Sequence, residues 1–301
     1  MNNNKDAKNP LDIRGQKQLE SISKTVYSNP ITSLSIAGHN ILQVNLSDLP
    51  PLDSCTAFGM NGMRKIRDID LTPLVKASQL KHIYISHTGF RRLEMSFLSK
   101  CKHLQSLTLL INENLSEIVL PEKWGSSEGF SEDYNSPEWL DYKIYIAGSK
   151  IEQLDLSGLE TDMETIYITS NHKLRNINLP NIAVRKVILE RNVLEDIDLS
   201  PICGPELWSI DLFKNRIRKL DLTCMVRSPN LRILKISQNP IYDRIDFTPL
   251  YRCKSFYCLI GNEYMTYVYD KRVNMESHPY LGDLVRNYVL FTKSEARRRG
   301  R

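Results

Sequence analysis

A short apolar pattern recurs along this chain about every 20 to 25 residues, and it constrains the fold more than any other feature. Each occurrence has two apolar residues separated by one position, often an Asn three residues later, and then a second apolar cluster. One unit of this size is too short to enclose its own apolar side chains, so it must bury them against its neighbours. The chain is therefore expected to fold as a stack of repeated units, a solenoid.

The pattern is clearest in the second half of the chain, where four successive units each carry the Asn. The strand residues and the Asn of these units are Ile166, Ile168 and Asn171, then Val187, Leu189 and Asn192, then Ile210, Leu212 and Asn215, then Leu234, Ile236 and Asn239. This arrangement resembles the leucine-rich repeat, written L-x-x-L-x-L-x-x-N-x-L. The resemblance spans residues 31–261 and implies an α/β solenoid, a horseshoe with a parallel concave sheet and short helical or irregular convex segments.

The first half follows the same frame more loosely. Its strand pairs are Leu34 and Ile36, Phe58 and Met60, Ile83 and Ile85, Leu107 and Leu109, and Ile144 and Ile146. The Asn position there holds His39, Met63, Thr88, Asn112 and Ser149, and a partial repeat at Phe256 and Leu259 brings the total to about nine or ten. Because a buried Asn can bond backbone groups in the turn after the strand, we expect local irregularity where Met63 replaces it.

The return side of the repeat carries a motif of its own. Ile69-Asp70-Leu71-Thr72-Pro73-Leu74 recurs, with conservative changes, at residues 197–202 and 245–250. Ser or Thr followed by Pro predicts an N-cap with Pro at the first helical position, and hence a helix of about one to three turns. The Asp recurs at one repeat position, as Asp70, Asp155, Asp198, Asp221 and Asp246. That recurrence indicates a structural role at the turn rather than catalysis.

The continuous repeat predicts one elongated domain rather than two globular ones. Residues 1–30 are expected to form a polar tail and a candidate N-terminal cap, ahead of the repeats at 31–261. The pattern of residues 262–292 predicts a cap strand followed by a helix with one apolar stripe. This helix is expected to cover the last repeat, and the alternative is that it binds a partner. Residues 293–301 form a basic tail.

One insertion, within residues 122–141, interrupts the regular spacing of the repeats. It contains six acidic residues against one Lys, and it carries Trp124 and Trp139. A long loop on a rigid scaffold is a common place for function, and interleaved aromatic side chains favour contact with a partner. The alternative is a surface loop that the fold merely tolerates. Trp124 and Trp139 are therefore candidate loop contacts.

Composition narrows the class of protein. A net charge of +5 and a pI near 8.8 do not by themselves indicate a nucleic-acid-binding protein. No apolar run is long enough for a membrane span, and the polar N-terminus lacks the apolar segment of a signal peptide. The six Cys are scattered, which predicts a reducing, cytoplasmic setting. Cys101 and Cys253 share a repeat position and are expected to be buried fillers, the alternative being a metal or redox site.

No catalytic set is recognisable in the sequence. It has no phosphate-binding Gly loop, no G-x-S-x-G and no H-E-x-x-H. His82 and His87 lie near one strand, but zinc would need further ligands close by. We therefore expect no enzyme activity, no metal and no cofactor.

The resemblance places the usual binding face on the concave sheet, where side chains stand between the core positions. The candidate contacts on that face are His82, Tyr84, Tyr145, Tyr167, Ile188, Trp208, Asp211, Phe213 and Lys235. Exposed aromatic residues flanked by charge are typical of interaction hot spots. The alternative is that the Tyr residues only reflect strand propensity.

These features favour a monomeric, non-catalytic scaffold that binds a protein or peptide on its concave face. One alternative, which resembles how several members of this family act, is a regulatory or specificity subunit of an enzyme in trans. The other is binding of nucleic acid or an anionic surface through the basic tail at 293–301, which predicts strong salt dependence.

Overall fold

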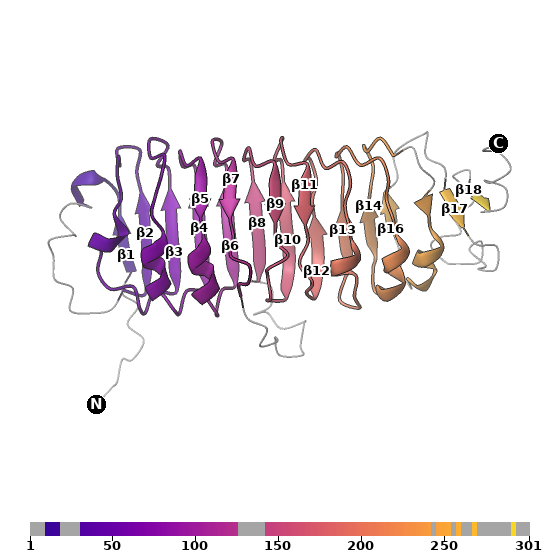
Figure 1. Cartoon of the computed structure of the whole chain (residues 1–301), viewed down its shortest axis with the longest axis horizontal. Helices are drawn as coiled ribbons and strands as arrows, with labels where there is room; N and C mark the ends of the chain where they lie inside the picture. The colour runs from indigo at the N-terminus through magenta and orange to yellow at the C-terminus, as the bar shows by residue number, and fades with distance from the viewer. Residues whose placement is uncertain are drawn as a thin grey trace, which may run out of the picture. The chain divides into compact units, whose positions relative to one another are not determined.

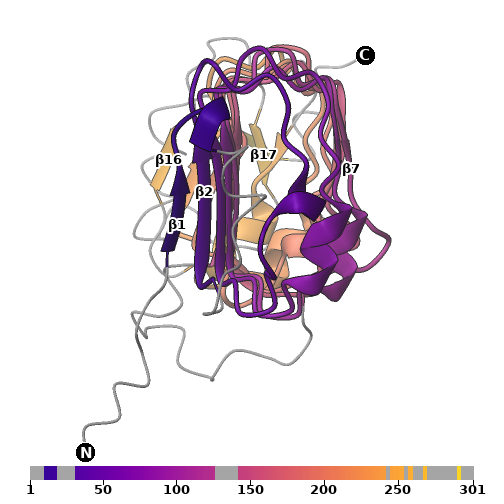
Figure 2. The ribbon, with the colours of Figure 1, turned by 90° about the vertical axis from the view of Figure 1, so that its left-hand side faces the viewer.

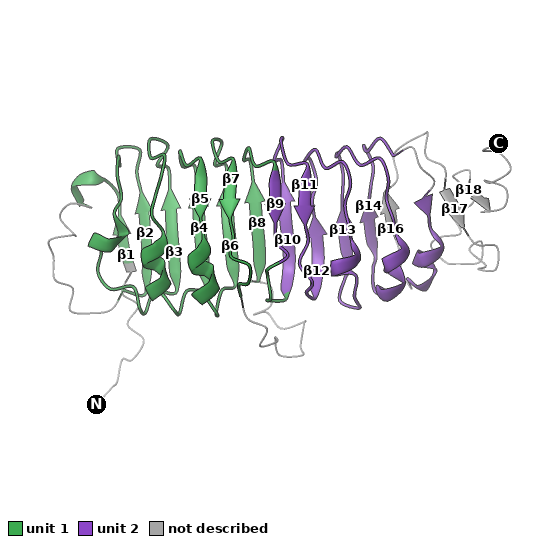
Figure 3. Cartoon of the chain, viewed as in Figure 1, with its two compact units in different colours: residues 1–152, 158–162 green, residues 153–157, 163–301 purple. Residues whose placement is uncertain are grey.

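The computed structural model describes residues 10–18, 31–125, 142–241 and 245–253, together with the backbone of three short strands farther along the chain. The chain divides into two compact units (Figure 3). Unit 1 comprises residues 1–152 and 158–162, and unit 2 comprises residues 153–157 and 163–301. Within each unit, neighbouring strands of the repeats pair in parallel, as the repeat pattern predicts.

The main sheet of unit 1 has the strand order β1-β2-β3-β4-β6-β8 (Figure 1). Its strands are β1 (Pro10–Ile13), β2 (Ser33–Ala37), β3 (Ala57–Asn61), β4 (His82–Ser86), β6 (Ser106–Leu110) and β8 (Lys143–Ala147). The sheet begins at β1, earlier than the predicted start of the repeats at residue 31. Seen from the N-terminal end, these strands lie on one side, and the helical turns and strand β7 (Glu117–Val119) lie on the other (Figure 2).

The return side of unit 1 is built from short elements. They are β5 (Arg92–Glu94), β7 (Glu117–Val119), and the 3-10 helices η1 (Leu46–Asp48), η2 (Thr72–Lys76) and η3 (Ser96–Lys100). β5 and β7 pair in parallel as a second, smaller sheet. Short return segments are expected, because a repeat of this length leaves no room for longer helices.

Unit 2 repeats the same plan with the strand order β10-β12-β13-β14-β16. These strands are β10 (Met163–Thr169), β12 (Val184–Ile188), β13 (Ser209–Asp211), β14 (Ile233–Lys235) and β16 (Tyr257–Leu259). Its other elements are β9 (Gln153–Asp155), β11 (Asn176–Asn178), β15 (Ile245–Asp246), β17 (Tyr267–Tyr269), β18 (Leu290–Thr292), η5 (Ser200–Ile202), η6 (Thr223–Arg227) and η7 (Thr248–Arg252). The strand predicted near Tyr264 to Asp270 is present as β17.

The register of the strands confirms the predicted core positions. In unit 1 the paired core residues run Leu34, Phe58, Ile83, Leu107 and Ile144, and in unit 2 they run Ile166, Val187, Ile210 and Leu234. All of these side chains are buried. The last repeat differs from the prediction by one residue, because Leu234 pairs with Cys258 and Leu259 pairs with Lys235.

The buried Asn residues bond the backbone as predicted. The Nδ2 group of Asn192 donates to the carbonyl oxygens of Ile168 and Leu189, at 2.8 and 2.9 Å, and its Oδ1 accepts from the N–H of Asn171. Asn112, Asn215 and Asn239 make equivalent bonds. Each Asn therefore links its own repeat to the preceding one. Its hydrogen bonds satisfy buried backbone groups that would otherwise have no partner.

Met63 is fully buried at the Asn position, and it offers no such bonds. The register nevertheless runs unchanged through β2, β3 and β4. The irregularity expected at Met63 therefore does not reach the strands.

Four of the five recurrent Asp residues accept hydrogen bonds from the first residue of a 3-10 helix. Asp221 Oδ1 accepts from the backbone N–H of Thr223 at 2.8 Å and from its hydroxyl at 2.6 Å, and Asp246 binds Thr248 in the same way. The structural role predicted for these carboxylates is confirmed. The prediction that Ser or Thr is the N-cap is wrong: η7 begins at Thr248, its N-cap is Phe247, and the Thr248 hydroxyl donates to Asp246.

A left-handed turn follows the strands at one repeat position. Non-Gly residues with positive φ are His87, Ile111, Ser170, Arg191, Lys214 and Gln238, and Gly38, Gly62 and Gly148 also have positive φ. The turn directs the chain sharply out of the sheet toward the return side. Most of these residues are Gly or unbranched polar residues, which tolerate the conformation best.

The cysteines differ in part from the prediction. Cys203 and Cys224, in successive repeats of unit 2, form a disulfide, whereas the sequence predicted reduced thiols. Cys101 and Cys253 are buried fillers, as predicted, and burial raises the pKa of Cys101 to about 11 and that of Cys253 to about 12. The disulfide removes one argument for a reducing compartment, and the cytoplasmic location stays a prediction.

The start of the insertion is part of the unit 1 core. Trp124 is fully buried, and its backbone forms a bridge with Leu159. The prediction that Trp124 is a loop contact is therefore wrong, because the large apolar ring fills the interior. Trp139 lies outside the described residues, and so does the tail at 293–301. Of the N-terminal tail and cap at 1–30 only residues 10–18 are described, and of the C-terminal cap at 262–292 only the strands β17 and β18, so the predicted cap helix is not tested.

Candidate protein-binding faces of the two sheets

The exposed face of unit 1 carries the predicted column of side chains. Ser35, Gly59, Tyr84, Thr108 and Tyr145 pair in register across β2, β3, β4, β6 and β8. Tyr84 is 42% exposed, and Tyr145 is half-buried. Both lie between core residues of their strands, because alternate side chains of a strand point to opposite faces. The prediction that these two Tyr residues lie on the outer face is confirmed.

His82 lies two residues before Tyr84 on β4 and is half-buried. Its Nδ1 atom lies 3.0 Å from the hydroxyl oxygen of Ser106 on β6. This hydrogen bond fixes the imidazole against the neighbouring strand. His82 therefore borders the Tyr84 column as an ordered polar group.

Ile111 was not among the predicted contacts. It follows β6, has a φ of 51° and is 43% exposed. A β-branched residue is rarely found at positive φ, and a large apolar side chain gains nothing by lying in water. The sequence signal was available, since Ile111 is the one large apolar residue among the described residues that occupy this turn position.

Unit 2 carries the corresponding column of Tyr167, Ile188, Asp211 and Lys235, in register across β10, β12, β13 and β14. Tyr167, Ile188 and Lys235 are half-buried, as expected for a face position. Asp211 is buried, and its Oδ2 lies 2.8 Å from Lys235 Nζ. The prediction that Asp211 is an accessible contact is wrong, because Lys235 on the next strand covers its carboxylate.

A second group on the unit 2 face centres on Lys186. Its Nζ lies 2.7 Å from Glu164 Oε1 and 5.8 Å from the centre of the Trp208 ring. Glu164 is buried, and its Oε2 has no hydrogen-bond partner in the described part of the chain. The lysine is held by an ion pair on one side and by a cation–π contact on the other. Sequence reasoning missed Glu164, because its place at the start of a long strand falls outside the repeat frame.

Two further aromatic residues are positioned by carboxylates. The hydroxyl of Tyr167 lies 3.4 Å from Glu190 Oε1, and the N–H of Phe213 donates to Asp211 Oδ1 at 3.0 Å. Phe213 and Trp208 are half-buried, so part of each ring is open to solvent. The unit 2 face thus presents ordered aromatic and cationic groups rather than a uniform charge.

The grouping and the hydrogen bonds of the titratable side chains in the described residues bear on a possible metal site. Among them there is no group of three or more His, Cys, Asp or Glu residues that could hold a metal ion. His82 bonds Ser106, and the recurrent carboxylates bond the turns that follow them. The arrangement suits recognition through aromatic anchors surrounded by polar groups.

The architecture of each unit identifies the fold. Parallel strands, one per repeat, are joined by short return segments, and buried Asn residues link the repeats at the consensus position. The fold is that of a leucine-rich repeat protein. No family model matches the sequence, and no curated protein matches it either.

Solved structures similar to this leucine-rich repeat protein include two from Listeria monocytogenes. An internalin is 17% identical over 86% of this chain and 78% of its own, with a TM-score of 0.39. The functional domain of InlJ, which includes a cysteine ladder, is 16% identical over 76% of this chain and 48% of its own, with a TM-score of 0.42. A leucine-rich repeat protein of Leptospira interrogans is 14% identical over 81% of each chain, with a TM-score of 0.24. Likenesses at this level carry no information about the partner.

No helix among the described residues is both long and apolar enough to cross a membrane.

Proposed function

We propose that this leucine-rich repeat protein is a non-catalytic interaction scaffold that binds a protein or peptide on the exposed faces of its sheets. The observation that carries the proposal is the exposure of Tyr84 on the unit 1 face, at 42%; Ile111, in the turn that follows β6, adds further exposed apolar surface, at 43%. Exposed apolar surface of this kind favours contact with another protein, because burial on binding removes it from water.

The ordered lysines and aromatic residues on the face of unit 2 support the same function. Lys186 and Lys235 are each held by a buried carboxylate, so they lose little side-chain entropy when a partner binds. Trp208 and Phe213 lie beside them with part of their rings exposed. Aromatic anchors next to ordered charges are favourable contacts in protein interfaces.

The test is affinity capture from the native host with quantitative mass spectrometry. The binding variant replaces Tyr145, Tyr167 and Phe213 by Ala, which removes three half-buried rings from the sheet faces. A matched control replaces Val75 and Val226 by Ser, since both are exposed on the return side, in η2 and η6. We expect the binding variant to lose a protein that the wild type and the control both capture. Equal capture by all three would contradict the proposal.

A regulatory role toward an enzyme in trans is the same proposal with an enzyme as the captured protein. The alternative of an anionic partner bound through the basic tail is separated by deleting residues 293–301. If capture survives the triple substitution but is lost on this deletion, the sheet faces are not the binding site. Binding through the tail would also weaken steeply with salt.

A further inference from the structure

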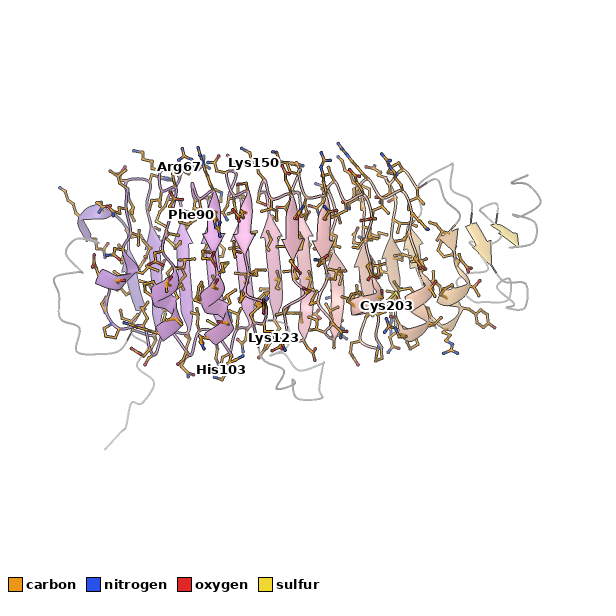
Figure 4. All side chains as sticks on the ribbon, viewed as in Figure 1. Arg67, Phe90, His103, Lys123, Lys150 and Cys203 are labelled. Atoms are coloured by element: carbon orange, nitrogen blue, oxygen red, sulfur yellow. A yellow bond between two sulfur atoms is a disulfide. The ribbon has the colours of Figure 1, made fainter. Side chains whose placement is uncertain are left out.

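A pocket of about 420 Å³ lies at one edge of unit 1, where β2, β3 and β4 end. Its charged and ring-bearing walls are Arg14, His39, Arg64 and His87. This is the edge from which Arg67 and Lys150 project, whereas His103 and Lys123 lie at the opposite edge (Figure 4). The pocket is separate from the Tyr84 column of the sheet face.

The pocket exists because two successive repeats lack a side chain at the left-handed turn. Gly38 and Gly62 occupy that position after β2 and β3, whereas His87 occupies it after β4. A Cβ added to Gly62 would lie 3.6 Å from Cε1 of His39, which also lines the pocket. Gly38, Gly62 and His87 all belong to the lining of the pocket.

The described lining of the pocket carries positive charge without a carboxylate. The Arg64 side chain has no hydrogen bond or ion pair within the described part of the chain, and the same holds for the rings of His39 and His87. Arg14 is paired with Asp12 at 2.6 Å, in an exposed ion pair that contributes little stability. Arg64 is therefore an unpaired cation of the pocket lining, and it is available to a bound anion. The imidazoles of His39 and His87 line the same pocket.

The backbone N–H groups of the two glycines in the lining are already bonded. The N–H of Gly38 donates to the carbonyl oxygen of Asn61, and that of Gly62 donates to Ser86. These two glycines therefore leave the recognition of an anion to other groups of the lining, among them the side chains of Arg64, His39 and His87. The Arg64 guanidinium and the His39 and His87 imidazoles put several N–H donors on the lining of one pocket, and a phosphate offers more acceptor oxygens to such donors than a carboxylate does.

We propose that this pocket binds a phosphate group, either as the free ion or carried by a small phosphorylated molecule. The volume exceeds the needs of a bare phosphate and lies within the range of small-molecule sites, so a phosphate monoester fits as well. The charge of such a group, about −1.5 to −2 at neutral pH, complements the unpaired Arg64.

The experiment is a titration of the full chain by calorimetry and by ³¹P NMR, at constant ionic strength. The probes are inorganic phosphate and phenyl phosphate. Arg64→Gln removes the unpaired cation, and Gly62→Asn adds a side chain to the lining with a residue that tolerates the left-handed turn. Arg91→Gln is the control, because Arg91 is exposed on the following repeat and does not line the pocket.

Both Arg64→Gln and Gly62→Asn are expected to weaken binding about tenfold or more, while Arg91→Gln changes it less than about twofold. Binding of both probes assigns the site to the phosphate group itself, and binding of phenyl phosphate alone assigns it to a monoester. Absence of binding of either probe to the wild type would overturn the proposal. So would equal weakening by Arg64→Gln and Arg91→Gln, which would indicate only the general charge of the edge.

Discussion

Lys235 Nζ lies 2.8 Å from Asp211 Oδ2 across neighbouring strands of unit 2, and the two partners differ in their access to water. The Lys235 side chain is 38% exposed and that of Asp211 only 7%. Without its partner, Lys235 can turn toward solvent, whereas Asp211 would remain a buried carboxylate. Replacing Lys235 therefore leaves a buried charge without its partner, whereas replacing Asp211 leaves only a lysine that can reach water.

The first prediction follows from this asymmetry. Lys235→Met should lower the free energy of unfolding by about 2 kcal/mol or more, because it leaves the buried charge of Asp211 without its cation. Asp211→Asn should cost less than about 1 kcal/mol, because the amide oxygen can still accept from the N–H of Phe213. Urea denaturation of both variants measures the order. A larger loss in Asp211→Asn would contradict the account of this pair.

The second prediction concerns acid. The hydrogen bond from the Ser200 hydroxyl lowers the pKa of Asp198, and that from Thr223 lowers the pKa of Asp221, in each case below the ordinary value of 3.8. A carboxylate with a lowered folded-state pKa stabilises the protein above the ordinary value, and the contribution is lost as the pH falls through the lowered one.

We therefore expect the double variant Asp198→Asn, Asp221→Asn to show a smaller drop in its urea midpoint between about pH 6 and about pH 3 than the wild type does. The amide can accept the same backbone N–H but does not titrate. An unchanged drop would show that these caps do not couple stability to pH.

The third prediction concerns the disulfide between Cys203 and Cys224. These residues are 21 apart in sequence, so reduction should lower the free energy of unfolding by about 3 kcal/mol. The double variant Cys203→Ser, Cys224→Ser should be equally destabilised and should no longer respond to the reductant. Native alkylation without reductant should spare Cys101 and Cys253, since burial raises their pKa values to about 11 and about 12. Alkylation of Cys203 under these conditions would disprove the bond.

The fourth prediction concerns the left-handed turn at Ile111. Ile111→Gly should raise the free energy of unfolding by about 1 kcal/mol, because glycine adopts positive φ without the strain of a β-branched residue. The matched control is Arg191→Gly at the same repeat position in unit 2, where an unbranched residue leaves less strain to relieve. Thermal unfolding of both variants compares the gains. We also expect Ile111→Gly to capture less partner, since it deletes exposed apolar surface.

The repeat physics made most of the fold predictable. Alternation of core and face residues located the repeat strands β2, β3, β4, β6, β8, β10, β12, β13 and β14, and the Asn at positions 171, 192, 215 and 239 marked groups that had to be bonded. The return-side strands β5, β7, β9 and β11 were not predicted. These signals are local and recur, so each repeat checks the next. β1 was missed because Pro10–Ile13 precedes the first complete repeat.

The side chains of the candidate faces were harder to predict, because exposure at a face position depends on the neighbouring strand. Asp211 occupies the predicted column, yet Lys235 covers it. Trp124 falls in a polar, acidic stretch, yet it fills the unit 1 interior. The disulfide was not predicted, because Cys203 and Cys224 are 21 residues apart in sequence and come within bonding distance only when the two repeats stack.

The most direct test of the central claim, that the sheet face binds the partner, compares two tyrosines with nearly equal exposure. Tyr84 on β4 is 42% exposed, and Tyr251 in η7 on the return side is 41% exposed. The measurement is the Kd of the purified partner for Tyr84→Ala and for Tyr251→Ala. The account predicts that Tyr84→Ala weakens binding about tenfold or more and that Tyr251→Ala leaves it unchanged. Weakening by Tyr251→Ala with no effect of Tyr84→Ala would contradict it.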